Sequence, residues 1–461
     1  MQGKKNKVAL FMQKGVIFLF FLFPVLSFSQ INCGKFTPIY MQGVAHFDST
    51  EYEPAVSKFT KVINETSLAK CFNKAYYYRG SSYFYLGIID SAITDFEKYV
   101  LLEPQDELGL RKLGALYYYI GNNDLALTYY KAALDLAPED VYTLFNMGEA
   151  FFQKGEFQSA DKMYRKAYKI DTTHYESLVG IAKVQAETEL YEMSINNLDR
   201  AIRMNPEQYQ AYFWKGIVYM RAPHMGKAET MFDLAEDRDS SDANIYLNRA
   251  ITHAFTFNYD KALDDYNKLL QIYPDSEDGL IGRAVILLEL EQFELAVKDL
   301  DECIALNKLN TDALFYRGYC QNKLEKYDLA ADDFTSIIAI DKENFEAWYN
   351  LGIAHYSMNE LEDAIADYSK AIAINNSDPD VYFNRGLVYD LQQEYQKAID
   401  DYTQSVFYNS ADPEAYFNRC VSKFMLGKKK EACEDCRMAE FYGKQNINPK
   451  LLKGCKKKKE K

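Results

Sequence analysis

The sequence predicts an all-α solenoid of about 12 antiparallel helix–turn–helix repeats. The first observation is a 34-residue period, a length typical of helical repeat arrays. The second is a low content of turn residues, with 11 Pro and 22 Gly among 461 residues, whereas an all-β fold of this length needs many turns. The third is that apolar residues recur at three- and four-residue spacing in each half-repeat, as amphipathic helices require.

One small residue occupies the same place in eleven successive units, and we call it the marker. No insertion breaks the 34-residue step, and a second small residue follows each marker by twelve positions, as Ala92 follows Gly80. Two helices approach closely only where small residues meet at their crossing. An irregular unit with Gly43 and Ala55 precedes the array. The markers are Gly80, Gly114, Gly148, Ala182, Gly216, Ala250, Ala284, Gly318, Gly352, Gly386 and Cys420.

The residues between the markers fit a helical hairpin. Large aromatic residues such as Phe96 and Tyr368 stand 16 positions after most markers, where they can fill the space beside the small residues. Gly87 stands seven after its marker, where a left-handed residue ends a first helix. Pro379 and Pro413 each follow an Asp, which gives an N-cap and a first-turn residue for the next helix.

The array divides the chain into four parts. Residues 1–29 resemble a signal peptide, with a Lys-rich start, an apolar run, and small residues before a cut after Ser29. The alternative is an uncleaved anchor that includes Val8–Met12. Residues 30–72 form an irregular N-terminal repeat, residues 73–446 eleven in-phase repeats, and residues 447–461 a Lys-rich tail. We therefore expect an exported protein of the periplasm or cell envelope, without an integral membrane span after cleavage.

The charge of the chain favours protein partners. The formal net charge is −14, and the body is more acidic than that because both termini are rich in Lys. Binding of duplex nucleic acid depends on neutralising phosphates with Lys and Arg, so we expect no nucleic-acid partner. The expected partners are proteins or peptide segments, including ones with basic surfaces.

The repeat resembles the tetratricopeptide repeat (TPR) family. The stretch Ala347–Gly352 (Ala-Trp-Tyr-Asn-Leu-Gly), with Ala364 and Tyr368 downstream, matches the family pattern, and the likeness extends over residues 36 to 446. Around residues 175–207 it is weakest, because Gln185 and Ser194 replace an aromatic residue and an alanine, so we expect a softer joint there. The resemblance implies a right-handed superhelical solenoid whose first helices line a concave wall.

In this family the concave wall usually holds peptide segments, which the resemblance implies for this chain too. Tyr and Trp are common interface anchors because they offer a large area at low rotamer cost. An alternative for any one of these residues is a place in the core between repeats. The aromatic wall residues are Tyr77, Tyr78, Tyr118, Phe145, Phe213, Trp214, Phe315, Tyr316, Tyr319, Tyr349, Tyr356, Phe383 and Phe417.

A column of asparagines lies two residues before the marker. An Asn side chain can donate to and accept from one peptide unit, and the column is similar to the peptide-gripping ladder of the O-linked N-acetylglucosamine transferases. A solvated consensus residue is the alternative. The paired basic residues of the chaperone-tail clamp are absent as a set, so we do not predict that ligand. The column comprises Asn146, Asn248, Asn350, Asn384 and Asn418.

Arginine and aspartate co-vary between the repeats. Six repeats carry Arg one residue before the marker, and the same six carry Asp fifteen after it. Only one of the other five has that Asp, Asp367. We predict an ion pair within each repeat that ties the two helices together, the alternative being recent duplication of one repeat. The pairs are Arg79 with Asp95, Arg249 with Asp265, Arg283 with Asp299, Arg317 with Asp333, Arg385 with Asp401, and Arg419 with Asp435.

Eight cysteines permit disulfides in an exported chain. They form three groups: Cys33 and Cys71 at the first repeat, Cys303 and Cys320 in adjacent repeats, and four at the C-terminal end. Those four are Cys420, Cys433, Cys436 and Cys455. The Cys433-x-x-Cys436 spacing admits redox or zinc chemistry, but Cys436 holds a large apolar slot, which favours core packing or a structural disulfide.

The sequence contains no Gly-rich phosphate loop, metal-ligand cluster or nucleophile–base spacing. We therefore expect no enzymatic activity, no cofactor and no metal. The function predicted is a protein-interaction scaffold of the cell envelope that binds protein segments in the aromatic and Asn-lined groove. The alternative is a structural subunit of an envelope assembly for secretion, motility or polysaccharide export, which would bind partners on its outer face and repeat edges.

Overall fold

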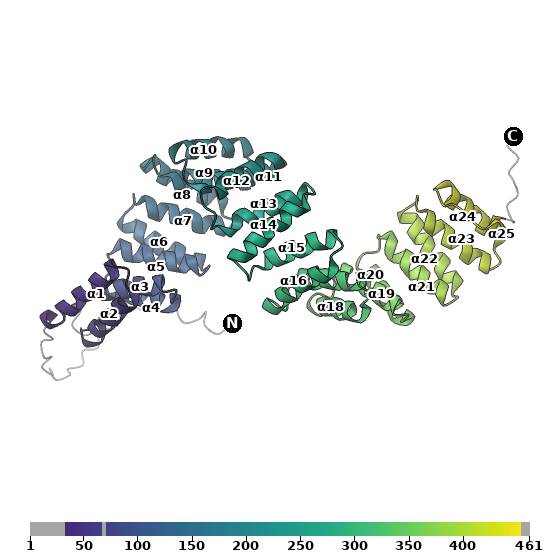
Figure 1. Cartoon of the computed structure of the whole chain (residues 1–461), viewed down its shortest axis with the longest axis horizontal. Coiled ribbons are helices and arrows are strands. Elements are labelled where there is room, and N and C mark those ends of the chain that lie inside the picture. Colours follow the sequence, from purple (N-terminus) through teal and green to yellow (C-terminus); the bar gives the residue numbers. More distant parts are fainter. Residues whose placement is uncertain (1–32, 67–70, 453–461) are drawn as a thin grey trace, which may run out of the picture. The chain divides into compact units, whose positions relative to one another are not determined.

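The computed structural model describes residues 33–66 and 71–452, and every regular element in those ranges is helical (Figure 1). The proposed signal peptide and the end of the Lys-rich tail lie outside the described residues. The described chain divides into two compact units, residues 1–189 and 190–461. The division falls inside the 175–207 repeat, where the sequence fits the period least well.

The first unit contains four helical hairpins followed by one more helix. A short 3-10 helix, η1 (Cys33–Lys35), precedes the hairpins. The two helices of each hairpin pack together, and each hairpin packs on the next. The helices are α1 (Thr37–Asp48), α2 (Tyr52–Thr66), α3 (Lys74–Tyr85), α4 (Ile89–Leu102), α5 (Glu107–Tyr119), α6 (Asn123–Leu136), α7 (Val141–Gln153), α8 (Phe157–Ile170) and α9 (Tyr175–Glu187).

The second unit opens with one helix and continues as seven hairpins and a final short helix. Its helices are α10 (Tyr191–Met204), α11 (Tyr209–Arg221), α12 (Met225–Glu236), α13 (Ala243–Phe255), α14 (Tyr259–Ile272), α15 (Glu277–Glu289), α16 (Phe293–Leu306), α17 (Thr311–Lys323), α18 (Tyr327–Ile340), α19 (Phe345–Ser357), α20 (Leu361–Ile374), α21 (Pro379–Leu391), α22 (Tyr395–Tyr408), α23 (Pro413–Met425), α24 (Lys429–Phe441) and α25 (Pro449–Leu452). The predicted all-α solenoid of helical hairpins is confirmed.

The core of most hairpins is a crossing of the marker against an aromatic ring of the second helix. A Cβ placed on Gly148 would lie 2.5 Å from Cε1 of Tyr164, and the same atom on Gly318 would lie 2.9 Å from Cζ of Phe334. No real Cβ approaches a ring so closely, so glycine sets the helix separation at these markers. Both aromatic rings are fully buried. Small and large residues therefore meet in most repeats, as the period predicted.

In most hairpins the turn between the two helices uses a left-handed residue seven positions after the marker. Gly87 and Gly121 take this place with φ of 74° and 75°. In most other repeats a residue with a side chain takes it, as Phe257 does with φ of 58°. Only glycine adopts this conformation without a steric cost. The fold therefore tolerates local strain in those turns, because the packed hairpins fix the chain on both sides.

Side-chain caps begin most of the first helices from α5 onward. The capping residue stands eight positions before the marker, and its side chain accepts from backbone N–H groups of the first turn, as Asp140 accepts from Thr143. Such caps satisfy donors that the helix leaves unpaired. In the described part of the chain, each helix is too short or too polar to span a bilayer.

Candidate functional site

The predicted wall residues all lie on first helices, which are the odd-numbered helices from α3 to α23. Every one of the eighteen aromatic and Asn side chains is half-buried. None is fully in the core and none stands free in solvent. We call the side of the hairpins that carries them the first-helix surface.

The aromatic residues three before the marker serve the core as well as this surface. Tyr77 packs edge-on against Phe96 of its own hairpin, with ring centroids 5.3 Å apart. Phe213 and Phe383 meet the equivalent rings, Phe232 and Tyr402, at 6.0 and 5.8 Å. These contacts stabilise the pairing of the two helices. These rings therefore contribute to the core, while each side chain keeps part of its surface accessible.

The asparagine column does not act uniformly. The side-chain amide of Asn350 donates to the carbonyl of Glu346 in its own helix at 2.8 Å, and Asn248 makes the same contact with Asn244. Asn384 differs because it donates to the Tyr349 hydroxyl of the preceding repeat, also at 2.8 Å. The amide donors of these three side chains are thus already engaged within the chain.

Two neighbouring hollows open on the first-helix surface of the first three hairpins. The larger has a volume of about 380 Å³ and the smaller of about 180 Å³. The larger is lined by Phe47, Lys74, Tyr77, Tyr78, Ser81, Tyr85, Tyr99, Asp106, Leu108 and Lys112. The smaller is lined by Ser81, Phe84, Tyr85, Phe96, Lys112, Ala115, Leu116, Tyr118 and Tyr119. Three of the predicted wall residues, Tyr77, Tyr78 and Tyr118, are among them.

Three residues belong to both hollows: Ser81, Tyr85 and Lys112. Ser81 lies one position after its marker and is buried, while Lys112 lies two before its marker and is exposed. Lys112 thus occupies the same column as the asparagines of other repeats. These three residues were not identified from the sequence. Lys112 could have been found from its position two residues before the marker, where other repeats carry predicted wall residues such as Asn, Tyr and Trp.

Exposed aromatic rings border the hollows. Tyr85 is 54% exposed and stacks on Tyr52, with ring centroids 4.7 Å apart. Tyr119 is 66% exposed and meets Phe84 edge-on at 6.0 Å. Large aromatic side chains that remain accessible and yet are held by their neighbours are typical anchors of protein interfaces.

The six arginines make bidentate contacts with the aspartates 16 residues later. In the Arg79–Asp95 pair the two N–O distances are both 2.7 Å, and the Asp95 side chain is 5% exposed. Each arginine also uses Nη1 to reach the second helix of the preceding hairpin, as Arg317 does with Asp301 at 2.6 Å. We call this three-residue arrangement the arginine lock. Its second acceptors are Thr60, Asp233, Asn267, Asp301, Ser369 and Thr403.

Sequence reasoning missed these second acceptors. They stand 17 residues after the marker of the preceding unit. In every unit that precedes an arginine-bearing repeat, the side chain at this position can accept a hydrogen bond. The lock therefore joins two hairpins as well as the two helices of one hairpin. It supports the geometry of the first-helix surface and does not form part of it.

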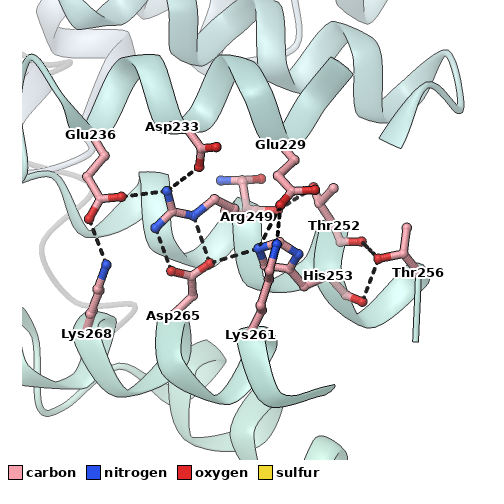
Figure 2. Close-up of polar contacts among 11 residues, drawn as sticks. Glu229, Asp233, Glu236, Arg249, Thr252, His253, Thr256, Lys261, Asp265 and Lys268 are labelled. Carbon is pink, nitrogen blue, oxygen red and sulfur yellow. Dashed lines mark hydrogen bonds and ion pairs between the residues drawn. The ribbon is translucent and has the colours of Figure 1, made fainter. Parts of the chain in front are cut away.

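The lock around Arg249 is the most elaborate (Figure 2). Arg249 contacts Asp265 of its own hairpin and both Asp233 and Glu236 of the preceding second helix, the last at 2.6 Å. His253 lies beside it, with Nε2 3.7 Å from Asp265 Oδ2. The imidazole is 4% exposed, and its Nδ1 atom has no hydrogen-bond partner. Burial lowers the pKa of His253, although the nearby carboxylates oppose that change.

A histidine replaces the arginine in one repeat. Asp367, the predicted aspartate without an arginine, has its Oδ2 atom 2.5 Å from Nδ1 of His355. His355 stands three after its marker, in the same column as His253. Burial raises the pKa of the Asp367 carboxyl, and His355 opposes that rise. This hairpin therefore ties its helices with an imidazole–carboxylate contact in place of the guanidinium–carboxylate contact.

The cysteines are divided between bonded and free. Cys420 and Cys436 form a disulfide that bridges the helices of the last hairpin, where other repeats place the marker and the aromatic ring. Cys71 and Cys433 are also disulfide-bonded. Cys303 and Cys320 do not form the possible bridge, because both are free thiols packed in an apolar core.

The side chain of Cys33 and the whole of Cys455 lie outside the described residues. The Cys433–Cys436 spacing does not make a metal site. In the described ranges, no group of three or more His, Cys, Asp or Glu side chains could hold a metal ion.

Family models for the tetratricopeptide repeat match most of the repeat array. They cover residues 74–106, 107–173, 180–243, 243–276, 281–345 and 379–411, and a model described as TPR repeat covers residues 354–393. These matches run through both units.

Individual relatives are distant. Anaphase-promoting complex subunit 3 of Schizosaccharomyces pombe is 25% identical over 120 residues, which are 26% of this chain and 18% of that protein. A solved tetratricopeptide repeat protein from Parabacteroides merdae is 21% identical and covers 53% of this chain and 97% of its own, with a TM-score of 0.42. The Cut9–Hcn1 hetero-tetramer of the anaphase-promoting complex is 13% identical and covers 91% and 96%, with a TM-score of 0.42.

The period, the helical hairpins with a glycine–aromatic crossing, and the family models agree. This chain belongs to the tetratricopeptide repeat family.

Proposed function

We propose that this chain is a non-catalytic scaffold that binds protein segments on its first-helix surface, chiefly at the two hollows of the first three hairpins. The observation that carries the proposal is the pair of adjacent hollows walled by aromatic rings from α3 and α5. Membership in the tetratricopeptide repeat family supports a protein-interaction scaffold in general. Concave sites with apolar walls and a few polar groups are the usual form of ligand sites.

We further propose that the scaffold works outside the cytoplasm, in the cell envelope. The signal-peptide pattern of residues 1–29 supports this location. So do the disulfide of Cys420 with Cys436 and the bonded state of Cys71 and Cys433, because structural disulfides persist in oxidising compartments.

Photo-crosslinking tests the position of the binding site. A benzophenone amino acid would replace Tyr119 at the hollows or, as the control, Phe407, which is 73% exposed on α22. Both variants would be expressed in cells that naturally produce the chain. We expect discrete adducts from position 119 and few from position 407. Adducts from position 407 with none from position 119 would overturn the proposal.

That second result would favour the other candidate function, a structural subunit that binds large partners through its edges. Phe407 and Phe441 are 73% and 78% exposed near the ends of second helices, and each meets a neighbouring tyrosine ring edge-on. Exposed rings at those places are the specific feature that favours the alternative.

A further inference from the structure

We propose that the segment bound at the hollows carries an acidic side chain that Ser81 and Lys112 receive, flanked by bulky apolar side chains that enter the two hollows. This inference rests on the proposed function and adds the chemistry of the partner. It concerns an internal Asp or Glu of the partner and not a chain terminus.

The hydroxyl of Ser81 is the first observation. Ser81 is 8% exposed, lies in the wall of both hollows, and makes no hydrogen bond with any described residue. Its neighbour Ser82 shows the usual arrangement, since that hydroxyl donates to the carbonyl of Tyr78 at 2.8 Å. The Ser81 hydroxyl therefore remains free to donate to an acceptor that a ligand places inside the hollow.

The ammonium group of Lys112 is the second observation. Lys112 lines both hollows and forms no ion pair within the described residues, whereas the adjacent Arg111 pairs with Asp140 at 2.8 Å. The Lys112 side chain is exposed, but partial desolvation and the nearby Arg111 lower the pKa of its ammonium group, and no acid within the described residues pairs with it. A carboxylate from outside is the group that would compensate it.

The remaining charges of the larger hollow agree with an anionic partner. Lys74 lines it and has no ion pair in the described part of the chain. Asp106 is the one acid in its wall, and that carboxylate is engaged, because it accepts from the backbone N–H of Leu108 and from the Tyr99 hydroxyl. The wall thus carries two ammonium groups against one carboxylate, and this local excess of positive charge is complementary to a negative group.

The size of the smaller hollow fits one side chain. Its volume of about 180 Å³ lies below the roughly 300–1,000 Å³ of pockets for whole small molecules, while the larger hollow, at about 380 Å³, lies near the lower end of that range. Phe84, Phe96 and Leu116 give the smaller hollow an apolar wall. Because the two hollows share Ser81 and Lys112, a carboxylate held there would have an apolar group on each side.

A displayed peptide library tests this chemistry on the full-length protein. The peptides would be fused through their C-terminal ends, so that each carboxylate comes from a side chain. Selection would use wild type, Lys112→Glu, Lys112→Gln, Ser81→Ala and, as a matched control, Lys131→Glu, since Lys131 is exposed on α6 outside the hollows. Circular dichroism would establish that each variant is folded.

We expect wild type and Lys131→Glu to enrich peptides with Asp or Glu beside a bulky apolar residue. Lys112→Glu should instead enrich Lys or Arg at that place, and Lys112→Gln should show no charge preference. For one enriched peptide, synthesised with an amidated C-terminus, Lys112→Glu should weaken binding about tenfold to a hundredfold in fluorescence anisotropy. Ser81→Ala should weaken it by a smaller factor.

Enriched peptides without an acidic residue, or an acidic preference that persists in Lys112→Glu, would overturn the inference while leaving the proposed function intact. Competition by free glutamate at the same concentration as the peptide would overturn the apolar part. If wild type enriches no peptide, the proposed function fails together with the inference.

Discussion

The arginine lock makes a quantitative prediction at Arg317. Its Nε and Nη2 atoms lie 3.0 and 2.6 Å from the two carboxylate oxygens of Asp333, whose side chain is 4% exposed. Its Nη1 atom lies 2.6 Å from Asp301, whose side chain is 54% exposed. One arginine thus makes a buried contact and an exposed contact of similar length, so each serves as the control for the other.

The expected magnitudes follow from burial. Removing one partner of a fully buried pair costs about 3–5 kcal/mol, while exposed pairs contribute about 0.2–1 kcal/mol. Arg317 is 21% exposed, which reduces the first figure. We expect Arg317→Met to destabilise the hairpin by about 2–4 kcal/mol. The coupling energy should be about 1.5–3 kcal/mol between Arg317 and Asp333, and below about 1 kcal/mol between Arg317 and Asp301.

The assay must be local, because a chain of two compact units need not unfold in one step. Hydrogen exchange of peptides from α17 and α18 gives the opening free energy of that hairpin. Two double-mutant cycles would use Arg317→Met with Asp333→Asn and with Asp301→Asn. Equal coupling energies in the two cycles, or a value near zero for the buried pair, would refute the argument.

The pH dependence provides a further check on the same variant. Burial raises the pKa of the Asp333 carboxyl, and Arg317 opposes that rise. Without the arginine the folded pKa should rise further above its unfolded value. A raised carboxyl pKa means that stability is lost as pH increases, so Arg317→Met should be more destabilising at pH 8 than at pH 5. An effect independent of pH would contradict this reasoning.

Three other perturbations test the fold. Gly352→Ala should destabilise the protein by about 1–3 kcal/mol in denaturant unfolding, because the new Cβ would lie 2.6 Å from the Tyr368 ring. Gly226→Ala, whose new Cβ would have no neighbour within 4 Å, should stabilise it slightly, and equal effects of the two substitutions would contradict the proposed glycine–aromatic crossing. Because burial lowers the folded pKa of His253 below its unfolded value, its contribution to stability is present above pH 6.5 and is lost as the pH falls, by up to about 1.4 kcal/mol per pH unit. The opening free energy of α13 and α14, taken from exchange rates corrected for the slower intrinsic exchange at lower pH, should therefore fall on acidification in wild type and fall less in His253→Gln, with the exposed His224→Gln behaving as wild type. Alkylation of the native protein should spare Cys303 and Cys320, since burial raises the pKa of each thiol to about 11; rapid labelling of either thiol would count against their burial. Reduction of the Cys420–Cys436 disulfide should destabilise the packing of α23 on α24 by about 3 kcal/mol.

Periodic features of the fold could be predicted from the sequence, because the residues that form each of them recur in many repeats. The glycine–aromatic crossing repeats at Gly80, Gly148 and Gly318, so eleven in-phase copies act as an internal alignment. The Arg–Asp contacts were accessible for the same reason, since both columns change together. The left-handed turns at residues such as Phe257 were less visible, because tertiary packing there overrides the preference for glycine.

Features that depend on residues of a single repeat, or on one local contact, could not be predicted from the sequence. The hollows depend on Ser81 and Lys112, and no other repeat carries that combination, so no column draws attention to it. The free state of Cys303 and Cys320 depends on how two side chains pack in one apolar cluster, which spacing does not reveal. The contribution of aromatics such as Tyr77 to the core also required coordinates, because spacing does not reveal that this half-buried ring packs on Phe96.

The arginine lock also bears on how such an array can change its length. Most of the arginines find one partner 16 residues ahead and another 16 residues behind, so the ion network has the same period as the hairpins. A gene rearrangement that adds or removes one whole 34-residue unit brings each remaining arginine to an equivalent acceptor. An insertion or deletion of any other length would move the arginines out of register with their carboxylate partners in the hairpins that it shifts. Natural variation in length is therefore expected to occur in whole units within the array.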